Sequence, residues 1–287
     1  MSSPLSFSSK ILTASITLGS GTFDGKNNIK LISGLRMTVN IKKSGHPSKN
    51  ECTIEIFGMP EGDMNKLATL SFKALKVAKN RIQVSAGDAS GMAVAFQGEI
   101  SDASADYGKA PDMGFQIKVV TGLYNSVAPS APQSASGGSS VASTMQSLAS
   151  QMGYGFENNG VSSQLHNQYL QGSAHEQAAS VADAADCEFG VDDNVLFIAP
   201  RGQPRGGSVP IISAATGMKG YPKFTKKGIE IECLYNPSIR LGGLVQVQSS
   251  IAVACGRWRV NNLEHDLESL KPGGKWETKF KASWVGE

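Results

Sequence analysis

The stretch Val127-Ala-Pro-Ser-Ala-Pro-Gln-Ser-Ala-Ser-Gly-Gly-Ser139 divides the 287-residue chain, because its Pro, Ser and Gly residues are typical of a linker. It introduces residues 140–199, in which apolar residues recur at helical spacing, and a segment rich in Gly and Pro, from Pro200 to Gly207, follows that region. On both sides the chain alternates polar and apolar residues, as half-buried β-strands do. The sequence therefore predicts a mainly β protein with a small α/β insertion.

We expect four segments along the chain. A first β-barrel occupies residues 1–126, the linker residues 127–139, a compact α/β domain residues 140–199, and a second β-barrel residues 200–287. Two barrels flanking one α/β domain is the predicted architecture.

The first segment predicts five or six antiparallel strands and one short helix. Residues 35–42 alternate apolar and polar side chains, and so do residues 51–56 beyond the turn at residues 44–50, which predicts a hairpin. Pro60, followed by Glu61 and Asp63, favours a helix start. Short alternating strands with a single helix are typical of a small barrel or sandwich.

The α/β segment predicts two helices and three short strands. One helix spans residues 141–152 and ends at Gly153, and the other begins at Ser173, where Ser173 and Glu176 have the spacing of a capping box. Strands are expected at residues 154–157, 187–191 and 195–199, and the turn Asp192-Asp-Asn194 joins the last two in a hairpin. The helices are rich in Ala, Ser and Gln, so this segment is interpreted as a spacer or docking surface.

The last segment predicts a second β module. Residues 229–235 and 275–284 alternate, and all three tryptophans lie here, which predicts that they form its core. Four strands alone would leave open edges. We therefore expect this module to pair with the first barrel or with another chain.

No catalytic, metal or cofactor site is predicted. His265 is flanked by Glu264 and Asp266, but on a strand the two carboxylates share one face and the imidazole takes the other. We interpret these residues as a solvated polar edge. His166 and His175 have no HExxH spacing, and there is no CxxC pair, nucleophile elbow or phosphate loop. We expect no enzyme and no cofactor.

Charge and hydropathy argue against nucleic acid and membranes as partners. Lys and Arg number 27 against 24 Asp and Glu, a net charge of +3, which is too low for a phosphate-gripping surface. Lys42-Lys43 and Lys226-Lys227 are isolated pairs that we interpret as solvated strand ends. No run approaches the roughly 18 apolar residues of a spanning helix. The N-terminus does not resemble a signal peptide, so synthesis in the cytoplasm is expected.

Specific strings in the last segment resemble those of a known family. The strings are Tyr235-Asn-Pro-Ser-Ile-Arg-Leu-Gly-Gly-Leu-Val-Gln-Val247, Gly256-Arg-Trp-Arg-Val260, Glu264-His-Asp-Leu-Glu-Ser269 and Gly273-Gly-Lys-Trp-Glu-Thr278. They resemble the C-terminal domain of tail baseplate hub proteins of phages and prophages. Phe57-Gly-Met59, Asp63-Met-Asn65 and Phe156-Glu-Asn-Asn-Gly160 are similar to strings of the same group.

The resemblance implies a homotrimeric virion protein. Two barrels of the tail-hub type per chain would form a pseudo-sixfold ring that adapts the six-fold tail tube to the three-fold central spike. The implied partners are further copies of the chain, the tail tube protein, the spike protein and other baseplate subunits, with DNA only as cargo in the channel. Exposed strand residues such as Lys275, Lys279 and Lys281 are candidate subunit contacts.

Three alternatives remain open from the sequence. The chain could be another tail component, such as a distal tail or tube-like protein. A carbohydrate- or receptor-binding module would place Trp258, Trp276 or Trp284 on the surface. A cell-wall hydrolase would need clustered carboxylates or a metal site, although no lysozyme-like or peptidase insertion is evident.

Overall fold

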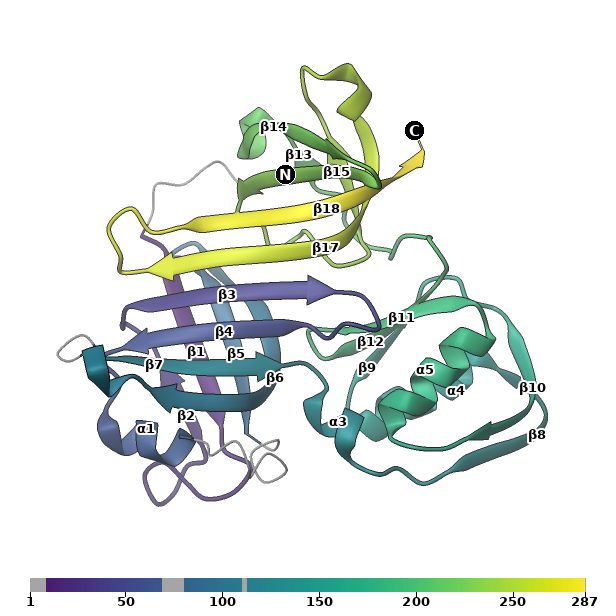
Figure 1. The fold of residues 1–287 in the computed structure, drawn as a ribbon, viewed down its shortest axis with the longest axis horizontal. Helices are drawn as coiled ribbons and strands as arrows, with labels where there is room; N and C mark the ends of the chain where they lie inside the picture. Colours follow the sequence, from purple (N-terminus) through teal and green to yellow (C-terminus); the bar gives the residue numbers. More distant parts are fainter. Residues whose placement is uncertain (1–8, 69–79, 110–112, 287) are drawn as a thin grey trace.

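The computed structural model describes residues 9–68, 80–109 and 113–286 (Figure 1). One 13-stranded sheet runs through the N-terminal and C-terminal parts of the chain, and two smaller sheets lie in the central part. In Figure 1 the central part, with helices α4 and α5, lies beside the large sheet. No helix of these residues is long and apolar enough to cross a membrane.

The N-terminal part contributes seven antiparallel strands in the order β3-β4-β7-β6-β5-β1-β2. The strands are β1 (Ile11–Thr17), β2 (Ile29–Ile32), β3 (Met37–Ser44), β4 (Glu51–Phe57), β5 (Arg81–Asp88), β6 (Gly91–Ala105) and β7 (Gly114–Val120). The predicted hairpin of β3 and β4 is confirmed, and alternate residues of each strand are buried. Helix α1 (Glu61–Leu67) follows Pro60 and buries Met64 and Leu67 in the core of this part.

The central part confirms the predicted helices. Helix α4 (Val141–Met152) ends at Gly153 in the left-handed conformation, and α5 (Ala174–Ala184) begins with the Ser173–Glu176 capping box. Strands β11 (Cys187–Asp192) and β12 (Val195–Pro200) form the predicted hairpin. Strand β9 (Gly155–Asn158) pairs in parallel with β12, and the two helices pack over this sheet around a separate apolar core.

The predicted linker is partly a strand. Helix α3 (Leu123–Val127) precedes it, and its second half forms β8 (Gln133–Ser140), which pairs with β10 (Gln164–Leu170). Neither strand shows the apolar alternation of a half-buried strand, so the sequence pattern could not reveal them. Their pairing satisfies backbone N–H and C=O groups, and these hydrogen bonds do not depend on which side chains the strands carry.

The C-terminal part contributes the remaining strands of the large sheet. They are β13 (Ile211–Ile212), β14 (Met218–Thr225), β15 (Gly228–Leu234), β16 (Leu244–Val247), β17 (Gly256–Ser269) and β18 (Trp276–Gly286). Short 3₁₀ turns lie at Tyr107–Lys109, Ala214–Thr216 and Ala252–Ala254. Of the tryptophans, Trp258 is buried and Trp276 half-buried, whereas Trp284 is 47% exposed and packs edge-on against Trp258. The prediction of a tryptophan core is therefore wrong for Trp284.

The two parts are joined edge to edge, which corrects the expectation of two closed barrels. Strand β17 pairs antiparallel with β3, from Asn262 opposite Ser44 to Ser269 opposite Met37. Within the described residues the path of paired strands runs openly from β14 to β2. The expectation that the second module pairs with the first is confirmed. An edge that pairs with the other module is not available to close its own barrel.

Both parts contain the same five-stranded arrangement. We call β3, β4, β7, β6 and β5 the N-terminal half-sheet, and β14, β15, β18, β17 and β16 the C-terminal half-sheet. Taken in chain order, each half-sheet places its strands first-second-fifth-fourth-third. The first strand of each is an edge of that half-sheet, and the fourth is the longest (Figure 1).

The strand registers of the half-sheets agree as well. The second and fifth strands pair through Ile54 opposite Ile117 in one and Ile231 opposite Phe280 in the other. The fourth and fifth strands shift register after Ile100 in one half-sheet and after Val260 in the other. Aligning the half-sheets by these pairs makes each strand of one equivalent to a strand of the other, residue by residue over most of its length.

Candidate functional site at the junction of the three parts

The junction between the half-sheets carries polar contacts on its outer face. Asn40 on β3 donates hydrogen bonds to Glu264 and Asp266 on β17, at 2.8 and 2.6 Å, and Lys42 lies 3.8 Å from Glu264. These contacts confirm that Glu264 and Asp266 share one face. On the inner face, Leu267 of β17 is buried in the apolar core of the N-terminal part. The joint therefore combines strand pairing, apolar packing and charge.

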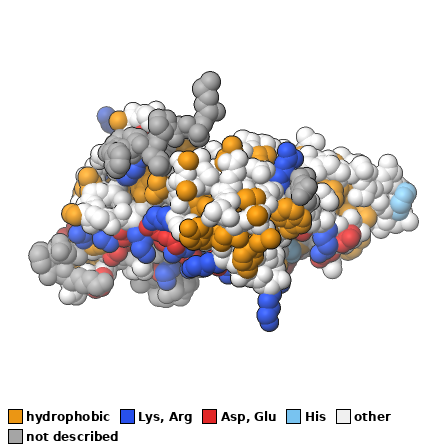
Figure 2. Space-filling view, turned by 90° about the horizontal axis from the view of Figure 1, so that it is seen from above, with side chains coloured by type: hydrophobic (Ala, Val, Ile, Leu, Met, Phe, Trp, Pro, Cys, Tyr) orange, Lys and Arg blue, Asp and Glu red, His pale blue; other side chains and the backbone are white. Residues whose placement is uncertain are grey.

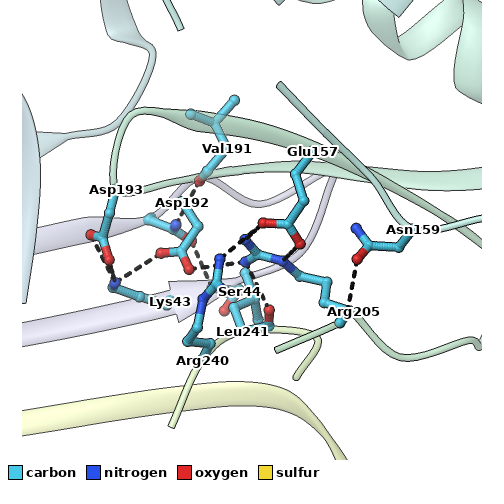
Figure 3. A network of polar contacts seen from close by, with 12 residues as sticks. Lys43, Ser44, Glu157, Asn159, Val191, Asp192, Asp193, Arg205, Arg240 and Leu241 are labelled. Atoms are coloured by element: carbon cyan, nitrogen blue, oxygen red, sulfur yellow. Dashed lines mark hydrogen bonds and ion pairs between the residues drawn. The ribbon is translucent and has the colours of Figure 1, made fainter. Parts of the chain in front are cut away.

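An ionic network with a buried centre ties the central part to β3 of the N-terminal half-sheet and to loops of the C-terminal part (Figure 3). Lys43 on β3 points at the turn after β11, where its Nζ lies 2.8 Å from Asp192 Oδ1 and 2.9 Å from Asp193 Oδ2. Beside it, Asn50 donates to the Val191 carbonyl at 2.8 Å and accepts from the Ser44 amide at 2.9 Å. The β3–β4 hairpin thus holds the end of β11 from one side.

Arg205, in the segment between β12 and β13, is the centre of this network. Its guanidinium forms a bidentate pair with Glu157 of β9, at 3.2 and 2.9 Å, and reaches Asp192 Oδ2 at 3.1 Å. It also donates to the Leu241 carbonyl and stacks 4.0 Å from the centre of the Phe197 ring. One side chain therefore contacts the central part and the C-terminal part at once.

The network balances its charges. Lys43, Arg205 and Arg240 are its cations, and Glu157, Asp192 and Asp193 its carboxylates; Arg240 lies 3.0 Å from Glu157. The side chains of Lys43, Asp192 and Arg205 are at most 6% exposed. Charges buried this deeply require partners, because an unpaired one carries a desolvation cost of several kcal/mol.

The pKa shifts agree with stable ion pairs. Burial alone would lower the pKa of Lys43, but Asp192 and Asp193 outweigh it and raise that pKa. Burial would raise the pKa of Asp192, but Lys43 and Arg205 hold it below its usual value. Partial burial likewise opposes ionisation of Glu157, and the bonds from Arg205 overcome it, which lowers the pKa to about 2. Asp193 differs, because burial and the neighbouring Asp192 raise its pKa. The shifts therefore favour the charged forms of Lys43, Asp192 and Glu157.

A cavity of about 330 Å³ lies at the same junction. Its walls include Ser44, His46, Glu188, Phe189, Arg201 and Arg259. Both arginines are engaged, Arg201 with Asp186 at 2.7 Å and Arg259 with Glu188. In the described parts of the chain no three His, Cys, Asp or Glu side chains group as ligands for a metal ion. The contacts at this junction therefore attach the central part to the N-terminal and C-terminal parts.

His265 is buried, so its interpretation as part of a solvated edge is wrong. It is 3% exposed, its Nδ1 lies 2.8 Å from the Thr278 hydroxyl, and its ring packs edge-on against Tyr235. Burial lowers the pKa of His265 to about 3. The imidazole is a neutral core group between β17 and β18.

The lysines proposed as subunit contacts lie on β18 and just before it. Lys279 is 3.8 Å from Glu232, and Lys281 is 3.8 Å from Glu230, both on the neighbouring strand β15. Lys275 is exposed, and its amide donates to Glu268 at 2.9 Å. The side chains of Lys279 and Lys281 therefore also pair within the sheet.

Sequence reasoning missed the network. Lys43 was interpreted as a solvated strand end, yet the alternation of β3 places Val39, Ile41 and Lys43 on the same buried face. That inward position was a readable signal for a buried partner. The turn residues Asp192 and Asp193 were recognised, but nothing local to them identifies Lys43, about 150 residues away, as the partner.

The sequence matches one protein family over most of its length. The match covers residues 11–272 and the family is described as Baseplate hub gp41. This chain belongs to the baseplate hub family. A comparison with curated proteins gives no match. The resemblance read from the strings around Tyr235 to Thr278 is thereby confirmed.

Solved structures of tail proteins share the fold of this hub-family chain. The 43 kDa tail protein of prophage MuSo2 from Shewanella oneidensis has a TM-score of 0.61 at 11% identity, with 96% of each chain covered. A tail protein from Neisseria meningitidis has a TM-score of 0.63 at 8% identity, covering 96% of this chain and 97% of that one. The Escherichia coli protein c3393, a component of the type VI secretion system, has a TM-score of 0.59 at 9% identity, covering 88% and 74%.

Proposed function

We propose that this chain is a structural subunit of the phage baseplate that assembles as a homotrimeric ring. The six half-sheets of three copies would offer six similar surfaces to the six-fold tail tube, while the ring itself presents three-fold symmetry to the central spike. Its role is to join two partners of different symmetry, without catalysis or a cofactor.

The repeated half-sheet is the observation that carries this proposal. Two units with the same strand order and matching registers, joined through β3 and the second half of β17, place two copies of one unit within a single chain. Identical chains that contact head to tail form a closed ring when the rotation between them closes, and a ring of three such chains contains six units. Membership of the baseplate hub family supports the same reading.

The proposal also assigns roles to the four segments. The segments 1–126 and 200–287 carry the repeated units, the segment 127–139 connects, and the α/β segment 140–199 lies outside the ring. Its attachment to Lys43 and Arg205 holds it in one orientation. Lys275, Lys279 and Lys281 remain candidates for contacts with neighbouring subunits, the tail tube protein or the spike protein. The protein would be found in the virion, with DNA only passing through its channel.

Mass measurement and imaging of the purified chain test this function. Light scattering should give three times the mass of the 30.2 kDa chain, and electron micrographs should show rings with three-fold symmetry and six similar lobes. Adding purified tail tubes should place these rings at one tube end. A chain that stays monomeric at tens of micromolar, or rings of another copy number, would contradict the proposal.

A further inference from the structure

The turn between β3 and β4, residues 45–50, meets the central part (Figure 1). The centre of the His46 ring on this turn lies 4.6 Å from that of Phe189 on β11 and 6.1 Å from that of His175 on α5. The His175 and Phe189 rings are 5.4 Å apart. We call these three residues the histidine contact. It joins the same two parts as the ionic network does, but it contains no carboxylate.

His175 is the half-buried histidine of this contact, whereas His46 is exposed. In the part of the chain that the structure describes, the Nδ1 atom of His175 is buried and has no hydrogen-bond partner. A charged imidazole donates from both of its nitrogens, so a charged His175 would hold a buried N–H without an acceptor. The histidine contact therefore favours the neutral form of His175.

The charged groups around His175 add to this preference. Burial is the main cause, and Lys49 and His46, both on the turn, also oppose a positive charge on the ring, whereas Glu176 favours one. The Glu176 carboxylate is engaged in the cap of α5, where it accepts from the Ser173 amide and hydroxyl at 2.8 and 3.0 Å. The pKa of His175 is lowered to about 4 as a result.

The other described elements around this imidazole leave it without a free carboxylate nearby. Helices α3 and α4 contact α5 and contain no Asp, Glu, Lys, Arg or His. On β11, Glu188 pairs with Arg259. Asp192, at the other end of β11, pairs with Lys43. Asp183 is on α5 itself, about two turns away, or roughly 12 Å along the axis. At the right-hand end of Figure 2, where the central part lies, uncharged side chains and backbone prevail as well.

We propose that the β3–β4 turn is an acid-sensitive attachment: protonation of His175 breaks the histidine contact, and the central part then separates from the turn while both parts keep their folds. The N-terminal and central parts have separate apolar cores, so separation does not require either part to unfold. Phe197 would keep the central part anchored in the C-terminal core. This inference goes beyond the proposed function and does not depend on the number of copies in the assembly.

Linkage gives the direction and size of the effect. Separation returns the pKa of His175 toward its ordinary value of 6.5, so the separated form binds a proton that the attached form does not. Attachment is therefore strongest above pH 6.5 and weakens as pH falls toward 4. At about pH 5 the equilibrium should shift toward separation by up to roughly 30-fold relative to about pH 7.5. Asp193 and Glu99 act in the opposite sense, because burial raises their pKa values.

Pulsed electron paramagnetic resonance between two spin labels tests this separation. Labels are attached in the variant Gln116→Cys/Gln146→Cys, at exposed positions of β7 and α4, with Cys255→Ser to remove the native cysteine that is not fully buried. Urea is added stepwise at about pH 7.5 and about pH 5. A second, longer label distance should appear at lower urea concentration at the acid pH. Circular dichroism of the same samples reports global unfolding, to which His265 contributes.

A matched pair of histidine variants assigns the effect. In the labelled chain, His175→Gln should remove the acid shift of the separation midpoint, whatever its value at neutral pH. His166→Gln, at an exposed position on β10, should keep it. An equal acid shift in His175→Gln would overturn the proposal. So would a single label distance that persists at both pH values until the circular dichroism signal is lost.

The variant Lys49→Gln provides a second test that leaves the imidazole in place. Removing this cation of the turn should raise the pKa of His175, measured by nuclear magnetic resonance of the histidine ring protons, and reduce the acid shift of the separation midpoint. Each unit of pKa regained corresponds to a tenfold smaller effect of protonation on attachment. A His175 pKa that is the same with and without Lys49 would show that the turn does not act on this histidine, and would overturn the proposal.

Discussion

At the scale of single residues, two adjacent lysines have opposite roles. Lys43 is buried and lies 2.8 and 2.9 Å from Asp192 and Asp193. The side chain of Lys42 is 62% exposed and makes a longer contact of 3.8 Å with Glu264. Lys43→Met should lower the free energy of unfolding by about 3 kcal/mol, because it leaves Asp193 without its ion-pair partner and the buried Asp192 with Arg205 alone. Lys42→Met, the matched control, should change it by less than about 0.5 kcal/mol. Urea unfolding measures both, and equal effects would contradict the ionic network.

His265 should make stability fall in mild acid. Its pKa is about 3 in the folded chain, because it is buried, against about 6.5 when unfolded. Between these values the unfolded state binds a proton that the folded state does not, so stability present above pH 6.5 is lost as pH falls, by about 1.4 kcal/mol per pH unit. His265→Gln should make this dependence shallower by about that amount between pH 6.5 and 4.5 in urea titrations, while His175, whose pKa burial lowers to about 4, keeps its own contribution. His166→Gln, at an exposed position on β10, should leave it unchanged.

At the scale of elements, the two helix starts of the central part differ. The Ser173 hydroxyl accepts from the Glu176 amide at 3.2 Å and the Glu176 carboxylate accepts from the Ser173 amide at 2.8 Å. Ser140 caps α4 without a side-chain bond. Ser173→Ala should therefore cost about 1 kcal/mol of unfolding free energy, and Ser140→Ala clearly less. Thermal unfolding followed by circular dichroism measures both, and a larger effect at Ser140 would be inconsistent with this assignment.

How much of each element the sequence reveals depends on how it is stabilised. Alternation and caps identify β3, β18, α4 and α5, because burial of one face leaves a local pattern. Strands β8 and β10 leave no such pattern, since they are ordered by backbone pairing with only Leu165 and Leu170 of β10 packing on the central core. The repeat was also hidden, although Ile54-Glu55 and Ile231-Glu232 occupy equivalent positions. Two identical residues in a strand are too few to detect without the register, and the partners of Lys43 and Arg205 depend on tertiary contacts.

At the scale of the whole molecule, the large sheet takes no strand from the central part, and we expect it to form without that part. None of its 13 strands lies in residues 140–199. Replacing these residues by a short Gly/Ser linker should keep the sheet and its assembly, with lower stability, because Phe197 leaves the C-terminal core and Lys43 and Arg205 lose their carboxylates. Circular dichroism and light scattering check the fold and the copy number. A truncated chain that fails to fold would contradict this independence.

The same variant tests the network by a thermodynamic cycle. With Asp192 and Asp193 removed, Lys43 is exposed to water and needs no partner, so Lys43→Met should become nearly neutral in the truncated chain. If Lys43→Met still lowered the free energy of unfolding of the truncated chain by about 3 kcal/mol, Lys43 would act through contacts within the N-terminal part and not through Asp192 and Asp193.

The repeated half-sheet has a genetic consequence. In a ring of identical single units, any substitution alters every position around the circle at once. In this chain the two units are encoded separately, so a change at Lys219 leaves its counterpart Thr38 untouched. β14 already differs from β3 by a register shift between Lys219 and Lys223. Each half can therefore evolve toward its own neighbour while the other half preserves the shared strand order.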